Sequence, residues 1–472
     1  MCVIYKYLLL LYFIMVGAMK IPCVERIPLL VIGLSFLQPA LTNSQYNNLT
    51  LIASALVLGA NFSLTEINQM FLKERSISTL SHFLSDAKFS TVEMQELYAT
   101  HAYFCHKVKN RKGYFIIDDT MTHHSKFCKW LHGVFVLFDH AIGTNLKARC
   151  IVVLYYTDGV STKFALTFRI YYQKSSKMPW VRRKKLVHKT KNELAIEMLE
   201  WALAKNYPPC TVLADSWFGV EPFIRELKRL GLSYVIEIKS SLKIRVPCSK
   251  PKLTPTGKFA KNQYDLKNLS TFFNLIIDMI TVGFAADKKL GKKAKVLYHT
   301  KIANVRLNAI SGKHRIVQSF DPSKKTVKYI LTNELTWESS RIISVYSYRW
   351  VIEEFFRNAK QLLDMEGVTV RSEQGITTAL CLVFYIDFLL HLENCKSTAE
   401  NVQRESKTIP SIVRRLQHEN QIKFISKIQE DGVFVNKWIS IIGSKVDRNR
   451  KQNKCLIKLS HQEAEEHLKK TG

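Results

Sequence analysis

The spacing of apolar and polar positions changes twice along this chain. Over the first 105 residues apolar side chains recur at helical intervals, and residues 64–85 contain two short amphipathic segments that meet near Ser76. Ser76 or Ser78 is placed to cap the second segment. This pair predicts either a helix-turn-helix that reads DNA or two helices that merely pack together. We therefore predict an N-terminal helical domain over residues 1–105, with DNA binding as its candidate role.

From residue 113 the period shortens to that of β-strands. Gly113–Thr120 is a short apolar run that ends in Asp118 and Asp119, and residues 151–173 predict a hairpin that turns at Asp158 and Gly159. Helices and strands then alternate, which is typical of a mixed α/β sheet. The predicted elements after the hairpin are a helix at 191–206, a strand at 210–215, a helix at 219–230 and a strand at 233–239. We assign residues 106–239 to the first part of a core domain.

Residues 240–325 interrupt this alternation. They are rich in lysine and predict strands at 295–299, 303–309 and 313–319, so we expect a basic, β-rich insertion. The core resumes over residues 326–395 with a strand at 328–334, a helix from about 338 and a very apolar helix at 376–392. The tail, residues 396–472, is predicted to be basic and helical.

The helix predicted from about residue 338 has one unusual polar face. At about 100° of rotation per residue, Tyr346, Arg349, Glu353 and Lys360 fall within about 60° of one another. The opposite side is occupied by Tyr348, Ile352, Phe355, Ala359, Leu362 and Leu363. A solvated face carrying mixed charges is the common explanation of such a stripe. Here, however, one carboxylate stands among three groups suited to binding phosphate.

The charge balance favours a polyanionic partner. Lys and Arg number 69 against 39 Asp and Glu, which gives a net charge of +30. The basic residues are spread along the chain, so nucleic acid is favoured over an anionic membrane. The ten cysteines are scattered without a C-x-x-C pair, which excludes a zinc framework or a dense disulfide scaffold and fits a reducing cytosol. We expect a cytoplasmic, nucleoid-associated protein.

Two apolar runs near the N-terminus suggest an alternative. Residues 7–19 resemble a signal sequence or a membrane anchor, and a second run covers 27–37. Each run is shorter than the roughly 20 residues that a membrane span requires. We therefore favour buried helices, while a membrane-anchored basic protein stays as a less favoured alternative.

Acidic residues stand where predicted strands end. Asp118 and Asp119 close the first strand, and Asp215 closes the strand at 210–215. Acids at such positions are often only turn residues or helix caps. Together with Glu353 they also supply the three carboxylates that two Mg²⁺ or Mn²⁺ ions require for phosphodiester chemistry.

These residues resemble a known signature. Tyr346-x2-Arg349-x3-Glu353-x6-Lys360 matches all four positions of the Y-(2)-R-(3)-E-(6)-K signature of DDE transposases of the insertion-sequence family numbered four. Glu353 follows Asp215 after 138 positions, which is similar to that family and its β-rich insertion. The resemblance implies an RNase H-like core. It also implies that Asp119, Asp215 and Glu353 bind two metal ions, and that Tyr346, Arg349 and Lys360 contact the DNA backbone. Asp119 is preferred to Asp118 because Asp119-Thr120 resembles the family's Asp-Thr motif.

The resemblance therefore implies a transposase that binds terminal inverted repeats and performs metal-dependent strand cleavage and transfer. Its partners would be double-stranded DNA, at the element ends and at the target, and a second copy of the chain in a synaptic homodimer. No small-molecule cofactor is expected. The alternatives are an RNase H-like DNA nuclease with another role and an inactive DNA-binding relic.

Overall fold

The computed structural model describes most of the chain between residues 21 and 430. The hypothesis of a signal or anchor at 7–19 and most of the tail prediction lie outside the described residues. The ranges left undescribed are 1–20, 72–75, 109–112, 129–130, 175–187, 249, 251–253, 257–263, 286–294, 400–407 and 431–472.

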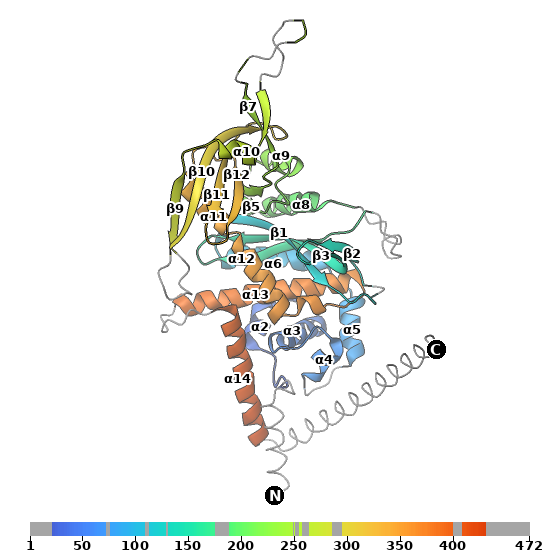
Figure 1. Cartoon of the computed structure of the whole chain (residues 1–472). Helices are drawn as coiled ribbons and strands as arrows, with labels where there is room; N and C mark the ends of the chain where they lie inside the picture. Colours follow the sequence, from blue (N-terminus) through green and yellow to red (C-terminus); the bar gives the residue numbers. More distant parts are fainter. Residues whose placement is uncertain are drawn as a thin grey trace, which may run out of the picture.

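Helices make up the N-terminal region, as predicted. Thr42 caps α3 with a reciprocal capping box to Gln45, and Ser76 caps α5 by accepting a hydrogen bond from the Thr79 amide at 3.0 Å. These helices lie together below the sheet in Figure 1. Their bounds are α2 Pro28–Gly33, the 3-10 helix η1 Ser35–Ala40, α3 Asn43–Val57, α4 Leu64–Gln69, α5 Ile77–Ser85 and α6 Thr91–Cys105.

The second apolar run is part of the protein core. Residues 27–37 form α2 and the start of η1, and Leu30, Leu34 and Leu37 are completely buried. Gly33 lies so close to the long helix α13 (Glu373–Ala399) that an added Cβ would be 2.6 Å from the Leu389 side chain. The run is therefore hydrophobic because it packs against another helix.

One mixed sheet of twelve strands organises the rest of the molecule. In its central part β1 lies between an antiparallel β3 and a parallel β5, and β5 is followed by a parallel β6. The order along the sheet is β2-β3-β1-β5-β6-β12-β11-β10-β7-β8, while β4 pairs with β3 and β9 with β10. The bounds are β1 Tyr114–His123, β2 Val134–Asp139, β3 Thr144–Thr157, β4 Lys163–Ile170, β5 Thr211–Ala214, β6 Tyr234–Ile238, β7 Lys243–Pro247, β8 Tyr264–Asn268, β9 Ile280–Ala285, β10 Lys295–Leu307, β11 Lys313–Asp321 and β12 Thr326–Thr332.

The predicted α/β alternation is present with small shifts. The hairpin is β3–β4, and at its turn Asp158 Oδ1 accepts the amides of Val160, Ser161 and Thr162 while Gly159 has a φ of +75°. The alternating elements are α8 Lys191–Ala204, β5, α9 Glu221–Arg229 and β6. The strands predicted at 295–299 and 303–309 form a single strand, β10. Strands from the basic region do not stand apart, because they extend the central sheet through β12.

Helices cover both faces of the sheet (Figure 1). In that view α8 and α9 lie above the central strands, whereas α12 and α13 lie below them. The remaining helices are α10 Leu269–Asn274, α11 Ser339–Ser347, α12 Trp350–Leu362, the 3-10 helix η4 Met365–Gly367, α13 and α14 Ile409–Glu430. The fold is thus an α/β arrangement with a large mixed sheet, consistent with an RNase H-like domain preceded by an N-terminal helical region.

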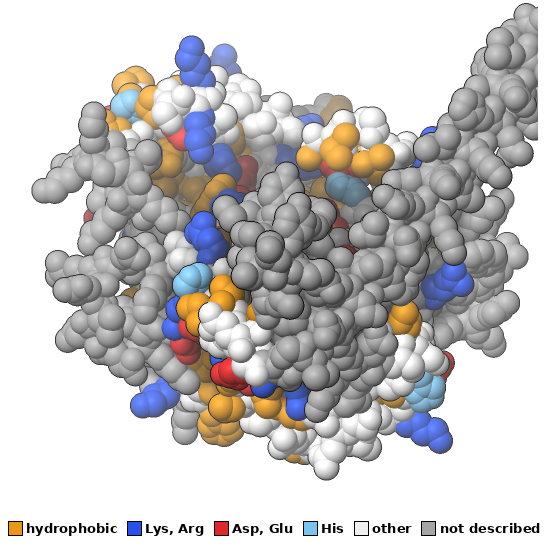
Figure 2. Space-filling view, turned by 90° about the horizontal axis from the view of Figure 1, so that it is seen from below, with side chains coloured by type: hydrophobic (Ala, Val, Ile, Leu, Met, Phe, Trp, Pro, Cys, Tyr) orange, Lys and Arg blue, Asp and Glu red, His pale blue; other side chains and the backbone are white. Residues whose placement is uncertain are grey.

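The very apolar helix predicted at 376–392 is α13, which runs between the sheet and the N-terminal helices. Among the described residues it is the one helix whose length and composition would allow a membrane crossing, over Glu373–Cys395. Of its most apolar stretch, 89% is buried inside the protein. Its hydrophobicity is accounted for by its position in the core. The face seen from below, shown in Figure 2, carries Lys and Arg side chains scattered among apolar ones.

Candidate active site

Two of the acids lie on adjacent parallel strands. Asp215 follows the last residue of β5, as predicted, but Asp118 and Asp119 lie inside β1, which pairs with β3 as far as His123 and does not end at the acids. The pairing of β1 with β5 runs in register from Tyr114–Thr211 to Ile117–Ala214. Asp118 and Asp215 come one position later on each strand. Residues in register on parallel strands point to the same face of a sheet, so these two side chains are neighbours on one face. The strand order therefore brings together two acids that lie almost a hundred positions apart in the sequence.

The loop after β5 is fixed by a close approach to β6. An added Cβ on Gly219 would lie 2.5 Å from the carbonyl oxygen of Glu237, so only glycine fits there without a shift of the backbone. In the same loop the amide of Trp217 donates to Asp215 Oδ1 at 3.0 Å. Burial raises the pKa of Asp215, and this hydrogen bond and the charge of Arg349 act in the opposite direction.

The signature residues lie on two short helices, not on the single helix predicted. α11 ends at Ser347 and α12 begins at Trp350, with Arg349 in the turn between them. The apolar back is as predicted, since Ile352, Phe355 and Ala359 are at most 1% exposed. The break still leaves the backbone of Arg349 right-handed, so the polar side chains keep a common direction toward the strand ends.

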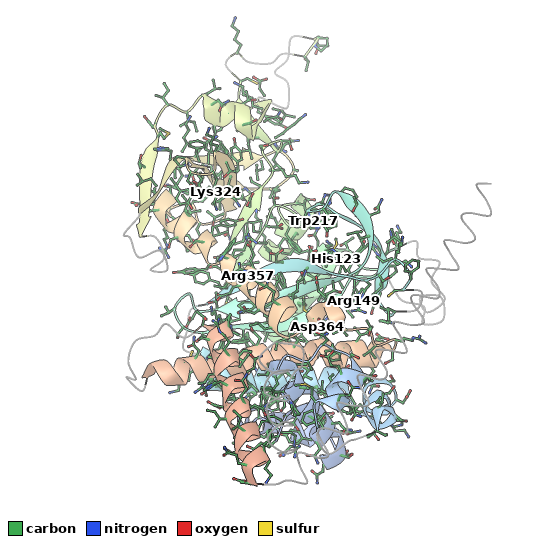
Figure 3. All side chains as sticks on the ribbon, turned by 60° about the horizontal axis from the view of Figure 1, so that its bottom comes forward. His123, Arg149, Trp217, Lys324, Arg357 and Asp364 are labelled. Carbon is green, nitrogen blue, oxygen red and sulfur yellow. The ribbon has the colours of Figure 1, made fainter. Side chains whose placement is uncertain are left out.

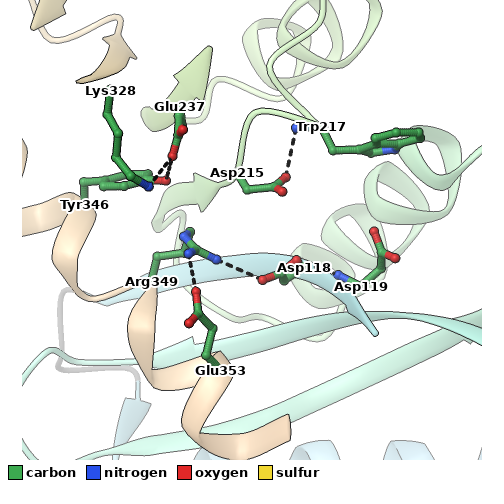
Figure 4. Close-up of polar contacts among 9 residues, drawn as sticks. All are labelled: Asp118, Asp119, Asp215, Trp217, Glu237, Lys328, Tyr346, Arg349 and Glu353. Carbon is green, nitrogen blue, oxygen red and sulfur yellow. Dashed lines mark hydrogen bonds and ion pairs between the residues drawn. The ribbon is translucent and has the colours of Figure 1, made fainter. Parts of the chain in front are cut away.

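Arg349 joins the strand acids to the helix acid (Figure 4). Its Nη1 donates to Asp118 Oδ2 at 2.9 Å, and its Nη2 donates to Glu353 Oε1. The Arg349 and Asp118 side chains are 14% and 15% exposed, so this ion pair is largely removed from water. Burial raises the pKa of Asp118 to about 7, although the Arg349 guanidinium opposes the rise and the nearby Asp215 and Asp119 add to it.

Asp119 faces the other side of the sheet, because successive residues of a strand alternate. Its Oδ2 accepts a hydrogen bond from Lys191 of α8 at 2.8 Å and one from the Cys150 thiol at 3.3 Å. Lys191 also lies over the Trp217 ring, 4.9 Å from the centroid. The structure thus groups Asp118 with Arg349, Glu353 and Asp215, and it groups Asp119 with Lys191 and Cys150.

Lys360 lies at the far end of the polar face. Its ammonium group donates to the carbonyl oxygen of Met121 on β1 at 2.7 Å and pairs with Glu366 at 3.1 Å. Glu354, beside Glu353, instead pairs with Lys163 at 2.8 Å. The four signature residues are therefore gathered along the carboxyl ends of β1, β5 and β6.

Tyr346 is engaged by a residue that sequence reasoning missed. Its hydroxyl donates to Glu237 Oε2 at 2.6 Å, and Lys328 donates to the same oxygen at 2.7 Å. The sequence contains an indication of this residue. In Tyr-Val-Ile-Glu-Ile of β6, Glu237 is a single acid in a strand whose other residues are buried. A charged residue in such a strand requires buried partners.

Other polar residues near the strands have local partners. His123 pairs with Asp139 at 2.7 Å. Figure 3 shows His123, Arg149 and Trp217 along the β1–β3 part of the sheet, with Lys324 apart from them on the inserted strands. The Trp217 ring is 45% exposed.

The donor set fits a hard divalent cation, because Asp118, Asp215 and Glu353 offer carboxylate oxygens on one side of the sheet. Within the described part of the chain, however, no three His, Cys, Asp or Glu side chains are close enough to hold one metal ion. Arg349 lies between Asp118 and Glu353 and neutralises them. A cation bound by these acids would therefore require the guanidinium to move aside.

Two comparisons with known families cover the part of the chain that carries these residues. Residues 37–266 match the family described as DDE superfamily endonuclease, and residues 187–386 match the transposase DDE domain. The first match includes Asp118 and Asp119, the second includes Glu353 and Lys360, and both include Asp215. Among curated proteins, none matches the chain. The two matches support a DDE transposase with a nuclease-type activity, of the kind that generally uses divalent metal ions.

Proposed function

We propose that this DDE transposase belongs to the insertion-sequence family numbered four. It binds the terminal inverted repeats of an element, cuts the strands there in a metal-dependent reaction and joins the ends to target DNA. The observation that supports this most is the grouping of two strand acids and Glu353 around Arg349. The match to the Y-(2)-R-(3)-E-(6)-K spacing adds the family assignment.

For the first acid we propose Asp118. Asp119 is the preference from the sequence motif, but Asp118 is in register with Asp215 and shares Arg349 with Glu353. Asp119 has its charge balanced by Lys191 on the opposite face. The proposed trio is therefore Asp118, Asp215 and Glu353, with Asp119 as the alternative that a direct comparison of variants decides.

Two Mg²⁺ or Mn²⁺ ions would be held by these carboxylates and would activate the attacking oxygen and stabilise the leaving oxygen. Once displaced from the acids, Arg349 can bind a phosphate through two parallel hydrogen bonds. Lys360 supplies a point charge to the same strand. We also propose a division of the chain into domains. A helical DNA-binding region covers residues 1–105, the core covers 106–239 and 326–395, the basic insertion covers 240–325 and the basic tail covers 396–472.

The direct test is cleavage of DNA that carries the element ends, with Mg²⁺ present. The wild type should cut at the ends and join a 3′-hydroxyl to a second duplex, whereas Glu353→Gln should do neither. Cutting without joining would favour an RNase H-like nuclease of another role, and binding without cutting would favour an inactive relic. A sedimentation measurement on the complex with two end duplexes would test the synaptic homodimer.

Salt provides a second test of DNA as the partner. The net charge of +30 predicts many phosphate contacts, so affinity should fall steeply between low and moderate salt as counterions are released. Binding that does not change over this range would contradict the proposal.

A further inference from the structure

A third carboxylate continues the row of acids across the sheet. β5 and β6 pair in parallel register from Val212–Tyr234 to Ala214–Ile236. Glu237 therefore stands beside Asp215 just as Asp215 stands beside Asp118, and all three point to the face covered by α11 and α12. Glu237 is not part of the signature, and it belongs to a strand otherwise made of buried residues.

Two hydrogen-bond donors from distant elements converge on one oxygen of Glu237. Tyr346 of α11 and Lys328 of β12 both donate to Oε2, at 2.6 and 2.7 Å. Lys328 also lies over the Tyr346 ring, 5.5 Å from its centroid. A phenol has one hydroxyl hydrogen, so Tyr346 cannot give it to a DNA phosphate while it donates to Glu237.

Tyr346 also lies next to Arg349, which binds two of the proposed catalytic acids. The Tyr346 side chain is buried, and the Arg349 guanidinium lies 5.9 Å from the centroid of its ring. Arg349 in turn holds Asp118 and Glu353. Glu237 thus stands at the start of a series of contacts that fixes the ring against which Arg349 rests.

We propose that Glu237 is a positioning residue for strand cleavage, which anchors the Tyr346 hydroxyl and thereby fixes the ring that supports Arg349 when the guanidinium leaves Asp118 and Glu353 for a phosphate. In the protein without DNA the Tyr346 hydroxyl is engaged by Glu237, so Tyr346 supports Arg349 through its ring. Lys328 neutralises the carboxylate, so that it does not repel the DNA strand. This inference rests on the proposed function, because its main measurement is DNA cleavage.

The geometry separates this role from a purely electrostatic one. If Glu237 acted only as a negative charge near DNA, its removal would strengthen DNA binding and leave the cleavage rate at saturating DNA unchanged. A positioning role instead lowers the rate at saturating DNA and leaves affinity nearly unchanged.

The experiment compares Glu237→Ala, Glu237→Gln, Tyr346→Phe and the double variant Glu237→Ala/Tyr346→Phe. Cleavage rate at saturating end DNA and the Kd for that DNA are both measured. We expect Glu237→Ala and Tyr346→Phe each to lower the rate about tenfold or more, with Kd within about twofold of the wild type, and the double variant to be no slower than the worse single one. Glu237→Gln keeps an acceptor for the hydroxyl and should lose less than Glu237→Ala. The matched control is Glu221→Gln, a partly exposed acid paired with Arg225 on α9.

Three results would overturn the inference. They are an unchanged cleavage rate in Glu237→Ala, weaker DNA binding by Tyr346→Phe than by the wild type, or a double variant whose loss of rate is the product of the two single losses. If the wild type itself cuts no DNA, the proposed function fails instead. In that case the free energies of unfolding of the same variants form a double-mutant cycle that tests the contact between Glu237 and Tyr346. If the two substitutions show no interaction energy, Glu237 does not anchor Tyr346.

Discussion

Two buried carboxylates in this protein have similar electrostatics and very different surroundings. Burial raises the pKa of Asp118, inside β1, to about 7 and that of Asp387, inside α13, to about 8. Arg349 donates to Asp118 at 2.9 Å. Neither oxygen of Asp387 has a hydrogen-bond partner in the described structure, and the nearest histidine nitrogen, of His391, is 3.6 Å away.

The difference shows what makes a buried acid a candidate for catalysis. A raised pKa alone marks both residues, so it does not separate a functional group from a structural one. Asp118 lies beside Asp215, which follows the end of β5, and it is paired with Arg349 from the turn between α11 and α12. Asp387 is enclosed by apolar helix packing, where the neutral acid is the stable form.

The largest effect should come from replacing the two acids of β1 one at a time. Asp118→Asn should lower metal-dependent cleavage roughly a thousandfold or more, because a metal ligand supports several kcal/mol of transition-state stabilisation. Asp119→Asn keeps the fold and should lower it less than about tenfold. Single-turnover cleavage of end DNA compares the two. If instead Asp119→Asn abolished cleavage and Asp118→Asn did not, Asp119 would be the first ligand.

The next largest effect should come from replacing Arg349, the positive charge beside Asp118 and Glu353. Arg349→Met leaves Asp118 and Glu353 without their partner, so the free energy of unfolding without metal should fall by about 3 kcal/mol. Mn²⁺ should then raise the Tm of this variant more than that of the wild type, since the ion no longer competes with the guanidinium. Thermal unfolding with and without Mn²⁺ measures both. The control Arg229→Met removes an exposed surface pair and should change stability by less than about 1 kcal/mol. If Mn²⁺ raised the Tm of Arg349→Met and of the wild type equally, Arg349 would not compete with the metal ion for the acids.

The last prediction concerns the core, where stability should change and cleavage should not. The folded protein holds a proton on Asp387 up to about pH 8, whereas the unfolded chain releases it near pH 4. Stability contributed by this group is therefore lost as pH rises between these values, by at most about 1.4 kcal/mol per pH unit. Asp387→Asn has no carboxyl group to titrate, so this dependence of stability on pH is lost. The free energy of unfolding of the variant, relative to that of the wild type, should therefore rise from pH 5 to pH 8. Unfolding curves at several pH values test this, and parallel pH profiles would contradict it. Cleavage at a fixed pH should be unaffected.

Much of the fold could be read from local patterns. The β3–β4 hairpin, α8, β5, α9 and β6 all lie within a few residues of their predicted bounds, because alternating burial and capping residues act locally. The break at Arg349 could not be read in this way, since Tyr348 and Arg349 continue the helical spacing. The single strand β10 also differs from the two predicted, and its pairing with β7, β9 and β11 explains its length.

The sequence by itself determined the polar stripe with its apolar back, the basic charge and the presence of acids on two predicted strands, although β1 continues past its two acids. These features depend on spacing and composition, which the chain carries without its fold. Only the tertiary structure decided which of two adjacent aspartates faces Asp215, and that Glu237 holds Tyr346. Both depend on strand register, and register is set by pairing between segments far apart in the chain.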